Sequence, residues 1–156
     1  MEMLQFSWIT DYLAIGPRPG PELRNLKKSG FKHIIDLNAD PEEAAGASQM
    51  GIEYHPVGVR DVDPVEDWLA KLELAVGIIK SASENHEPVY LHCTYGKGRC
   101  PTFAMAYLVS KGKAVQEATA LVRGKHPDVW SPGNPTPKYA EILEAYSKLK
   151  GQSRTD

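Results

Sequence analysis

Residues 92–102, with the sequence HCTYGKGRCPT, combine a nucleophile and an anion-binding group within one short segment. Cys93 supplies a thiol, and Arg99 supplies a planar guanidinium that can bind two phosphate oxygens at once, a geometry that lysine cannot match. Gly96 and Gly98 allow tight turns or close approach of the backbone to a ligand. A thiolate that attacks a phosphate monoester would form a phosphocysteine, which water later hydrolyses. The pattern predicts phosphoryl transfer through Cys93.

The segment lies between a predicted buried strand at residues 89–92 and an apolar helical run at residues 102–110. A strand that turns through glycines into a helix points successive backbone N–H groups and a positive helix end at one place, which suits a tetrahedral oxyanion. The same dipoles and Arg99 favour a thiolate over a thiol. The predicted phosphate-binding loop consists of Thr94, Tyr95, Gly96, Lys97, Gly98 and Arg99.

The Cys and Arg separated by five residues, with His92 in front, resemble the signature loop of the protein tyrosine phosphatase superfamily. The glycines and the Pro-Thr pair after the loop look most like the small dual-specificity phosphatases, and weaker similarity extends from about residue 8 to residue 146. The resemblance implies that the ring of His92 hydrogen-bonds the loop backbone and helps to lower the pKa of the cysteine. It also implies Ser or Thr after the arginine, where this chain has Cys100, a weaker donor.

Cys100 supports two further hypotheses. Slower breakdown of the phosphoenzyme is one, because the family's hydroxyl at this position speeds that step. The other is a reversible disulfide with Cys93 that protects the nucleophile from irreversible oxidation. The segment 130–137 is predicted to support the loop, with Asn134 as the residue expected to hydrogen-bond.

The leaving oxygen needs a proton, so an acid must lie on a second loop that faces the first. Residues 58–67 contain three candidates, Asp61, Asp63 and, least favoured, Asp67. Asp63 precedes Pro64 at a predicted helix start, where capping is the ordinary role of an aspartate. Asp61 matches the pattern of the dual-specificity phosphatases. We therefore predict Asp61 as the general acid, with Asp63 as the alternative.

Removal of phosphate from phosphotyrosine in proteins is the leading functional hypothesis, with phosphoserine and phosphothreonine as further substrates of a shallow cleft. An RNA 5′-triphosphatase is an alternative, because residues 92–99 also resemble that branch of the superfamily. A phosphoinositide phosphatase is favoured only by Lys97, and a phosphate-binding module with weak activity only by Cys100. The net charge of −2 argues against a nucleic acid partner.

Composition restricts the remaining possibilities. The 156 residues suit one catalytic domain over residues 1–150, followed by a polar tail at residues 151–156. No signal peptide or membrane-spanning run is evident, and two cysteines in one loop fit a reducing cytoplasm. We expect a cytoplasmic monomer that binds phosphorylated proteins or peptides and no membrane. No group of His, Cys and carboxylates has metal-site spacing, and a cysteine–arginine mechanism needs no metal or other cofactor.

Strand and helix patterns alternate along the chain, which predicts an α/β fold with a central, mostly parallel sheet of four to five strands flanked by helices, as in the phosphatases it resembles. In such a fold the ligand site lies at the carboxyl ends of the strands. Two short strands are predicted within residues 7–15, followed by strands at 31–37, 53–59 and 89–92. Helices are predicted at residues 21–29, 41–50, 64–84, 102–110, 115–125 and 137–149.

Overall fold

Five short strands form a single sheet in the order β1-β2-β5-β3-β4 in the computed structural model, which describes residues 4–126, 128–130 and 136–151. The strands are β1 (Ser7–Thr10), β2 (Leu13–Gly16), β3 (His33–Asp36), β4 (Glu53–Pro56) and β5 (Val89–His92). Only the β1–β2 pair is antiparallel, and it turns at residues 11–12. The other pairs are parallel. The predicted α/β class with a mostly parallel sheet is therefore confirmed.

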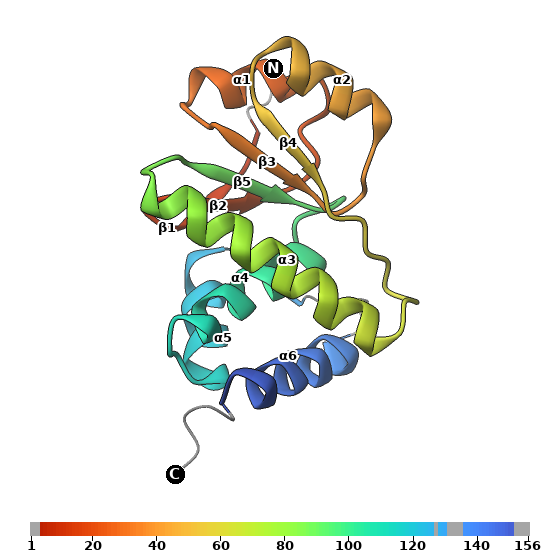
Figure 1. Cartoon of the computed structure of the whole chain (residues 1–156), viewed down its shortest axis with the longest axis vertical. Helices are drawn as coiled ribbons and strands as arrows, with labels where there is room; N and C mark the ends of the chain where they lie inside the picture. Colours follow the sequence, from red (N-terminus) through yellow and green to blue (C-terminus); the bar gives the residue numbers. More distant parts are fainter. Residues whose placement is uncertain (1–3, 127, 131–135, 152–156) are drawn as a thin grey trace.

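Helices cover both faces of this sheet (Figure 1). One face carries α1 (Leu23–Lys28), which follows a 3₁₀ turn at Gly20–Glu22, and α2 (Pro41–Gln49). On the other face lie α3 (Val65–Glu84), α4 (Arg99–Ser110), α5 (Val115–Lys125) and α6 (Thr136–Gly151). Within the described residues, no helix is both long enough and apolar enough to cross a membrane.

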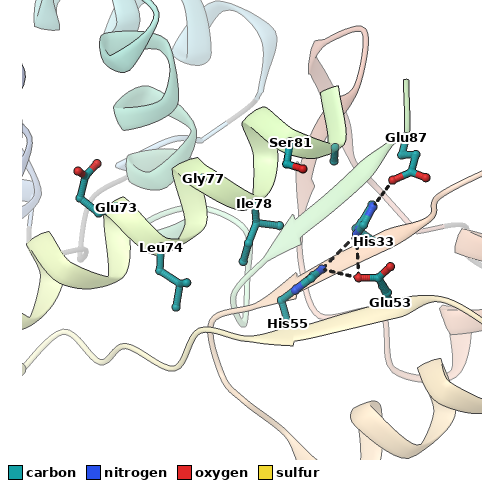
Figure 2. Close-up of a pocket in the computed structure, with 10 residues that line it drawn as sticks. His33, Glu53, His55, Glu73, Leu74, Gly77, Ile78, Ser81 and Glu87 are labelled. Atoms are coloured by element: carbon teal, nitrogen blue, oxygen red, sulfur yellow. Dashed lines mark hydrogen bonds and ion pairs between the residues drawn. The ribbon is translucent and has the colours of Figure 1, made fainter. Parts of the chain in front are cut away.

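The parallel pairing fixes which side chains share each end of the sheet. Residue 33 lies opposite residue 53, and Asp36 lies opposite both Pro56 and His92. His33 and Glu53 consequently meet at the amino-terminal ends of β3 and β4 (Figure 2). Asp36 and His92 meet at the carboxyl ends, where the phosphate-binding loop begins. The two ends of the same strands therefore carry separate groups of polar side chains.

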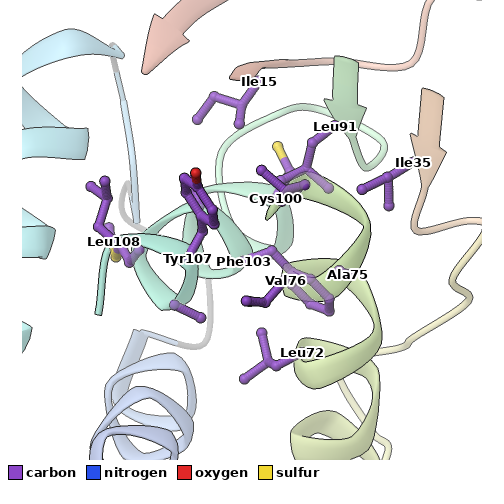
Figure 3. Packing of buried hydrophobic residues seen from close by; sticks show 14 of the residues in the cluster. Ile15, Ile35, Leu72, Ala75, Val76, Leu91, Cys100, Phe103, Tyr107 and Leu108 are labelled. Carbon is purple, nitrogen blue, oxygen red and sulfur yellow. The ribbon is translucent and has the colours of Figure 1, made fainter. Parts of the chain in front are cut away.

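Two hydrophobic clusters hold the layers together. The larger lies between the sheet and α3 to α6, and it includes Leu72, Phe103 and Leu91, each fully buried (Figure 3). The smaller lies under α1 and α2. The apolar residues at helical spacing in α3 are all buried: Trp68, Leu72, Ala75, Val76 and Ile79. Nearly all of α4 is buried as well, which fixes the helix that follows the phosphate-binding loop.

Two helix starts differ from the prediction. Helix α4 begins at Arg99, three residues earlier than expected, because the loop leads directly into the first helical turn. Helix α3 is preceded by Pro64 as its N-cap, and the Asp63 side chain does not cap it. Asp63 instead accepts a 2.8 Å hydrogen bond from the backbone N–H of Arg60. The predicted tail lies outside the described residues from 152 onward, and Gly151 ends α6.

Candidate active site

Cys93 lies directly after β5 with only 3% of its surface exposed. Its pKa is well below that of an ordinary thiol. A hydrogen bond from the Cys100 side chain is the largest cause, and it outweighs the opposing effect of burial. The backbone N–H groups of Cys100 and Gly96 and the charge of Arg99 lower the pKa further. The loop geometry thus favours a thiolate at Cys93 near neutral pH.

Cys100 is the thiol partner of this thiolate. It is completely buried in the first turn of α4, and burial, together with the neighbouring Cys93, raises its pKa well above the ordinary value. Its sulfur also lies 3.6 Å from the carbonyl oxygen of Gly16. Both cysteines are free, and their opposite pKa shifts mean that Cys93 favours the charged form while Cys100 retains its proton as a donor.

The two loop glycines satisfy different requirements. Gly96 has a φ of 76°, in the left-handed region, and an added Cβ would lie 2.7 Å from the backbone carbon of Gly16. Gly98 has no such φ, but a Cβ there would lie 2.6 Å from the hydroxyl oxygen of Tyr139. A side chain at either position would therefore displace a neighbouring segment and distort the loop.

Arg99 is held in place by neighbours on three segments. Its Nη1 donates to the carbonyl oxygen of Val59 at 2.8 Å, in the segment that carries the acid candidates. Its Nη2 donates to Oδ1 of Asn38 at 2.9 Å and to the hydroxyl of Thr94 at 3.2 Å. A guanidinium has five N–H donors, so these three bonds orient the group and leave donors for a ligand.

His92 lies under the loop in a buried polar network. Its Nδ1–H donates to the carbonyl oxygen of Cys93 at 3.0 Å, and its Nε2–H donates to the buried carboxylate of Glu43 on α2. Burial opposes the imidazolium, but the hydrogen bond and charge of Glu43 and the charge of Asp36 outweigh it and raise the pKa of His92. The ring of His92 therefore hydrogen-bonds the loop backbone from the buried side of the loop. The groups that lower the pKa of Cys93 are those of the loop itself.

The acid candidates occupy different environments. Asp61 is half-buried and accepts a 2.8 Å hydrogen bond from the hydroxyl of Tyr139, the residue that covers Gly98. A hydrogen bond from the Arg60 backbone N–H lowers the pKa of Asp63, and the charge and side chain of Arg60 help it to outweigh the opposing effect of desolvation. Asp67 is exposed on α3. Among the three, Asp61 is the one whose partner also contacts the phosphate-binding loop.

The side chains of Tyr95 and Lys97 lie at the solvent-exposed edge of the loop, called the rim below. Tyr95 is 77% exposed. Lys97 is half-exposed with its ammonium 3.9 Å from a carboxylate oxygen of Asp128, as expected for a solvated lysine. Beside the loop, a pocket of about 500 Å³ is lined by Arg18, Leu37, Asn38, Gly58, Val59, Arg60, Asp63 and Arg99. The pocket thus brings two exposed arginines, Arg18 and Arg60, beside the predicted phosphate-binding loop.

Two further residues support the loop: His126 was not predicted from the sequence, whereas Trp130 belongs to the predicted segment 130–137. His126 donates from Nε2 to the carbonyl oxygen of Gly96 at 2.7 Å and accepts from Ser7, and burial lowers its pKa, which favours the neutral ring. The Trp130 backbone N–H donates to the carbonyl oxygen of Lys97 at 2.7 Å, so the start of the segment 130–137 does support the loop. Asn134 lies outside the described residues. Only the folded chain brings His126 to the loop, and its position in the sequence gives no sign of this contact.

The structure also brings together two groups of potential metal ligands that the sequence spacing did not reveal. In the residues that the structure describes, these are Asp36, Glu43 and His92 under the loop, and His33, Glu53 and His55 at the far end of the sheet. Asp36 already accepts from the backbone N–H groups of residues 38 and 40 and from the hydroxyl of Tyr54. The first group is therefore satisfied as a hydrogen-bond network that supports His92.

Comparison with known proteins agrees with this geometry. The family model described as dual specificity phosphatase, catalytic domain matches residues 13–147. The phosphatidylglycerophosphate phosphatase PTPMT2 of Arabidopsis thaliana is 30% identical over 94% of this chain and 65% of its own length. The dual specificity protein phosphatase Mpk3 of Drosophila melanogaster is 30% identical over 67% of this chain, which spans only 25% of Mpk3. A crystal structure of PTPMT1 in complex with PI(5)P has a TM-score of 0.81 at 19% identity, covering 96% of this chain and 99% of that one.

Proposed function

Because the chain belongs to the dual-specificity phosphatase family, we propose that it hydrolyses a phosphate monoester through Cys93 and that its substrate is a phospholipid headgroup carrying a second phosphate. Phosphatidylglycerophosphate, which has a terminal phosphomonoester and an internal phosphodiester, is the headgroup we favour. The pocket that brings Arg18 and Arg60 beside Arg99 is the observation on which this choice rests.

The proposed reaction has two steps. The thiolate of Cys93 attacks phosphorus, an S–P bond forms, and the P–O bond to the substrate alcohol breaks while Asp61 gives its proton to the leaving oxygen. Arg99 and the backbone N–H groups of the loop bind the equatorial oxygens. Water then attacks the phosphocysteine, the Asp61 carboxylate takes its proton, and inorganic phosphate leaves with the thiolate restored.

The charge of the pocket supports a substrate with two phosphates. Arg99 and the backbone N–H groups of the loop are enough to bind one phosphomonoester. Arg18 and Arg60 therefore add positive charge that a single phosphomonoester does not require. The backbone N–H of Arg18 donates to the carbonyl oxygen of Thr94 at 3.1 Å, which fixes its position relative to the loop. Asp63 lies 3.4 Å from Nε of Arg60 and offsets part of that charge. A phosphodiester in the pocket would be bound by charge-assisted hydrogen bonds.

The similarity to PTPMT2 gives independent support, since that relative is named as a phosphatidylglycerophosphate phosphatase and matches nearly the whole chain. A lipid substrate would bring the active-site face to a membrane surface, which differs from our sequence-based expectation of no membrane partner. The protein-phosphatase hypothesis stays as the second candidate. It is favoured by the exposed ring of Tyr95 at the rim, which could pack against the ring of a phosphotyrosine.

The two candidates are separated by comparing kcat/KM for phosphatidylglycerophosphate in mixed micelles and for a phosphotyrosine peptide. We expect the lipid to be preferred. Arg18→Ala and Arg60→Ala should each lower its kcat/KM by roughly 10-fold, the effect of losing a hydrogen bond to a charged group, with little change for the peptide. Lys111→Ala is the matched control, because it removes one charge at the opposite end of α4 from Arg99. A preference for the peptide, unaffected by either arginine, would instead support protein phosphotyrosine.

A further inference from the structure

A second group of chemically active side chains lies at the amino-terminal ends of β3 and β4. His33 faces Glu53 across the parallel pair, and His55 follows two residues later on β4, so all three project from the same face of the sheet. They point toward α3, as Figure 2 shows. The catalytic loop follows the opposite, carboxyl-terminal end of the strands, so this group lies outside the site described above.

Three atoms of this group form a compact triangle. His33 Nδ1 lies 3.1 Å from His55 Nε2, and Oε2 of Glu53 lies 3.9 Å from each of these nitrogens. A circle through three such points has a radius of about 2.1 Å, which is the length of a zinc–nitrogen bond. A tetrahedral ion with bonds of about 2.1 Å holds its ligand atoms about 3.4 Å apart, so the carboxylate oxygen would move about 0.5 Å toward the two nitrogens and the nitrogens would separate by about 0.3 Å. We propose that His33, Glu53 and His55 form a binding site for one Zn²⁺ ion.

Glu87 orients the ring of His33 for metal binding. Its carboxylate accepts a 2.8 Å hydrogen bond from Nε2–H of His33, which leaves the lone pair of Nδ1 directed toward His55 and Glu53. A carboxylate behind a histidine ligand is the usual outer partner of a zinc-bound imidazole, because it fixes the tautomer and the ring orientation. Without metal, the same lone pair accepts from Nε2–H of His55. Binding of Zn²⁺ replaces that proton, which moves to Nδ1 of His55 or to solvent.

Burial and access also suit a metal. The side chains of His33 and His55 are 9% and 23% exposed, whereas that of Glu53 is 73% exposed. A cavity of about 430 Å³ adjoins the group, with Leu74, Gly77 and Ile78 of α3 on its opposite wall (Figure 2). The cavity leaves room for water as the fourth ligand. Two nitrogens and one carboxylate select zinc over magnesium or calcium, which prefer oxygen ligands.

The ion would connect the edge strand β4 to β3 and, through Glu87, to the turn between α3 and β5. Because it binds the folded chain and lies away from Cys93, it should raise thermal stability by mass action without being required for hydrolysis. A hydrogen-bonded pair of histidines with no affinity for metal is the competing explanation of the same contacts. Metal titration distinguishes the two.

Zn²⁺ titration by calorimetry should be made on a Cys93→Ser chain, because the thiolate of Cys93 could otherwise bind the metal. We expect one ion per chain. His55→Gln should weaken binding by at least 10-fold, and Glu87→Gln by about 10-fold through loss of the outer partner. His86→Asn is the control, since it removes an exposed histidine near the same turn and should change nothing.

Thermal melts in the presence of a chelator establish that each variant is folded before metal is added. In the Cys93→Ser chain, Zn²⁺ should also shift the ring resonances of His33 and His55 and leave those of His86 in place. Absence of binding to the Cys93→Ser chain would overturn the proposal. An affinity unchanged by His55→Gln, or ring shifts confined to other histidines, would overturn it equally.

Discussion

The hydroxyl of Tyr139 on α6 donates a 2.8 Å hydrogen bond to Oδ1 of Asp61, while the same ring covers Gly98 in the phosphate-binding loop. One side chain thus fixes the acid loop relative to the loop that carries Cys93. An aspartate that must deliver a proton to a leaving oxygen gains from such a restraint, because small errors in position cost rate. The ring of Tyr139 can lie over residue 98 because that residue is glycine, which has no side chain to displace the ring.

Tyr139→Phe should lower kcat by about 3- to 10-fold on a substrate with an alkyl leaving group, the value of one hydrogen bond. The ring still packs on Gly98, so KM should change little. Tyr146→Phe is the matched control, because that tyrosine lies on the same helix and donates to Glu73 rather than to the site. Equal rates for the two variants would show that Tyr139 does not position the acid.

Asp61→Asn should lower kcat on the same substrate by roughly 10²- to 10⁴-fold, the range for loss of a general acid. Asp63→Asn should have little effect, because the Arg60 backbone N–H, with the charge and side chain of Arg60, lowers the pKa of Asp63 and keeps it ionised. Steady-state rates of the pair decide between the two candidates, and a larger loss in Asp63→Asn would reverse the assignment.

The lowered pKa of Asp63 also predicts a pH dependence of stability. A depressed carboxyl pKa contributes stability above its unfolded value, and this contribution is lost as the pH falls through the folded value. The difference in melting temperature between wild type and Asp63→Asn should therefore be present at neutral pH and shrink in acid. A constant difference would mean that the Arg60 contacts do not depend on the charge of Asp63.

Cys100→Ala removes the largest cause of the low pKa of Cys93. Loss of a hydrogen bond to a charged group is worth about 1.5 to 3 kcal/mol, so the pKa of Cys93 should rise by roughly 1 to 2 units. The pH dependence of alkylation by iodoacetamide measures this directly. Cys100→Ser keeps a donor and should retain the low midpoint. An unchanged profile in Cys100→Ala would mean that the backbone N–H groups and Arg99 suffice.

Glu43→Gln should destabilise the chain by about 3 to 5 kcal/mol, because it leaves the buried His92 without its charged partner. Burial opposes the charge on His92, and Glu43 raises the pKa of His92 despite it. The contribution is therefore fully present below the ordinary histidine pKa and lost as the pH rises through the folded value. Urea unfolding at acidic and alkaline pH tests this, with the exposed Glu42→Gln as control. A loss that is independent of pH would contradict a charged His92.

The strand and helix order was predictable because each element carries its own local pattern, as the buried stripe of α3 does. The tight turn of residues 93–99 between β5 and α4 was predictable because all its groups lie within a few residues, and its role in phosphate binding stays a prediction. Glu43, Asn38, Tyr139 and His126 were not, because each reaches the loop from a distant segment and acts through a contact that only the packed layers create.

The group formed by His33, Glu53 and His55 shows the same limit more sharply. Two residues at alternate positions of one strand and a third on its neighbour have no recognisable spacing along the chain. Only the parallel register of β3 and β4, which pairs residue 33 with residue 53, brings them together. A sequence can suggest each strand, but the register depends on the packing of both faces of the sheet.

Rapid-quench trapping of the phosphoenzyme tests the central claim most directly. Wild-type protein mixed with excess phosphomonoester and quenched in acid should carry one phosphoryl group per chain, located by mass spectrometry on Cys93. Cys93→Ser should carry none and should lose turnover, whereas Cys100→Ser should still be labelled at Cys93. A phosphoryl group on another residue, or turnover that survives Cys93→Ser, would contradict hydrolysis through a phosphocysteine.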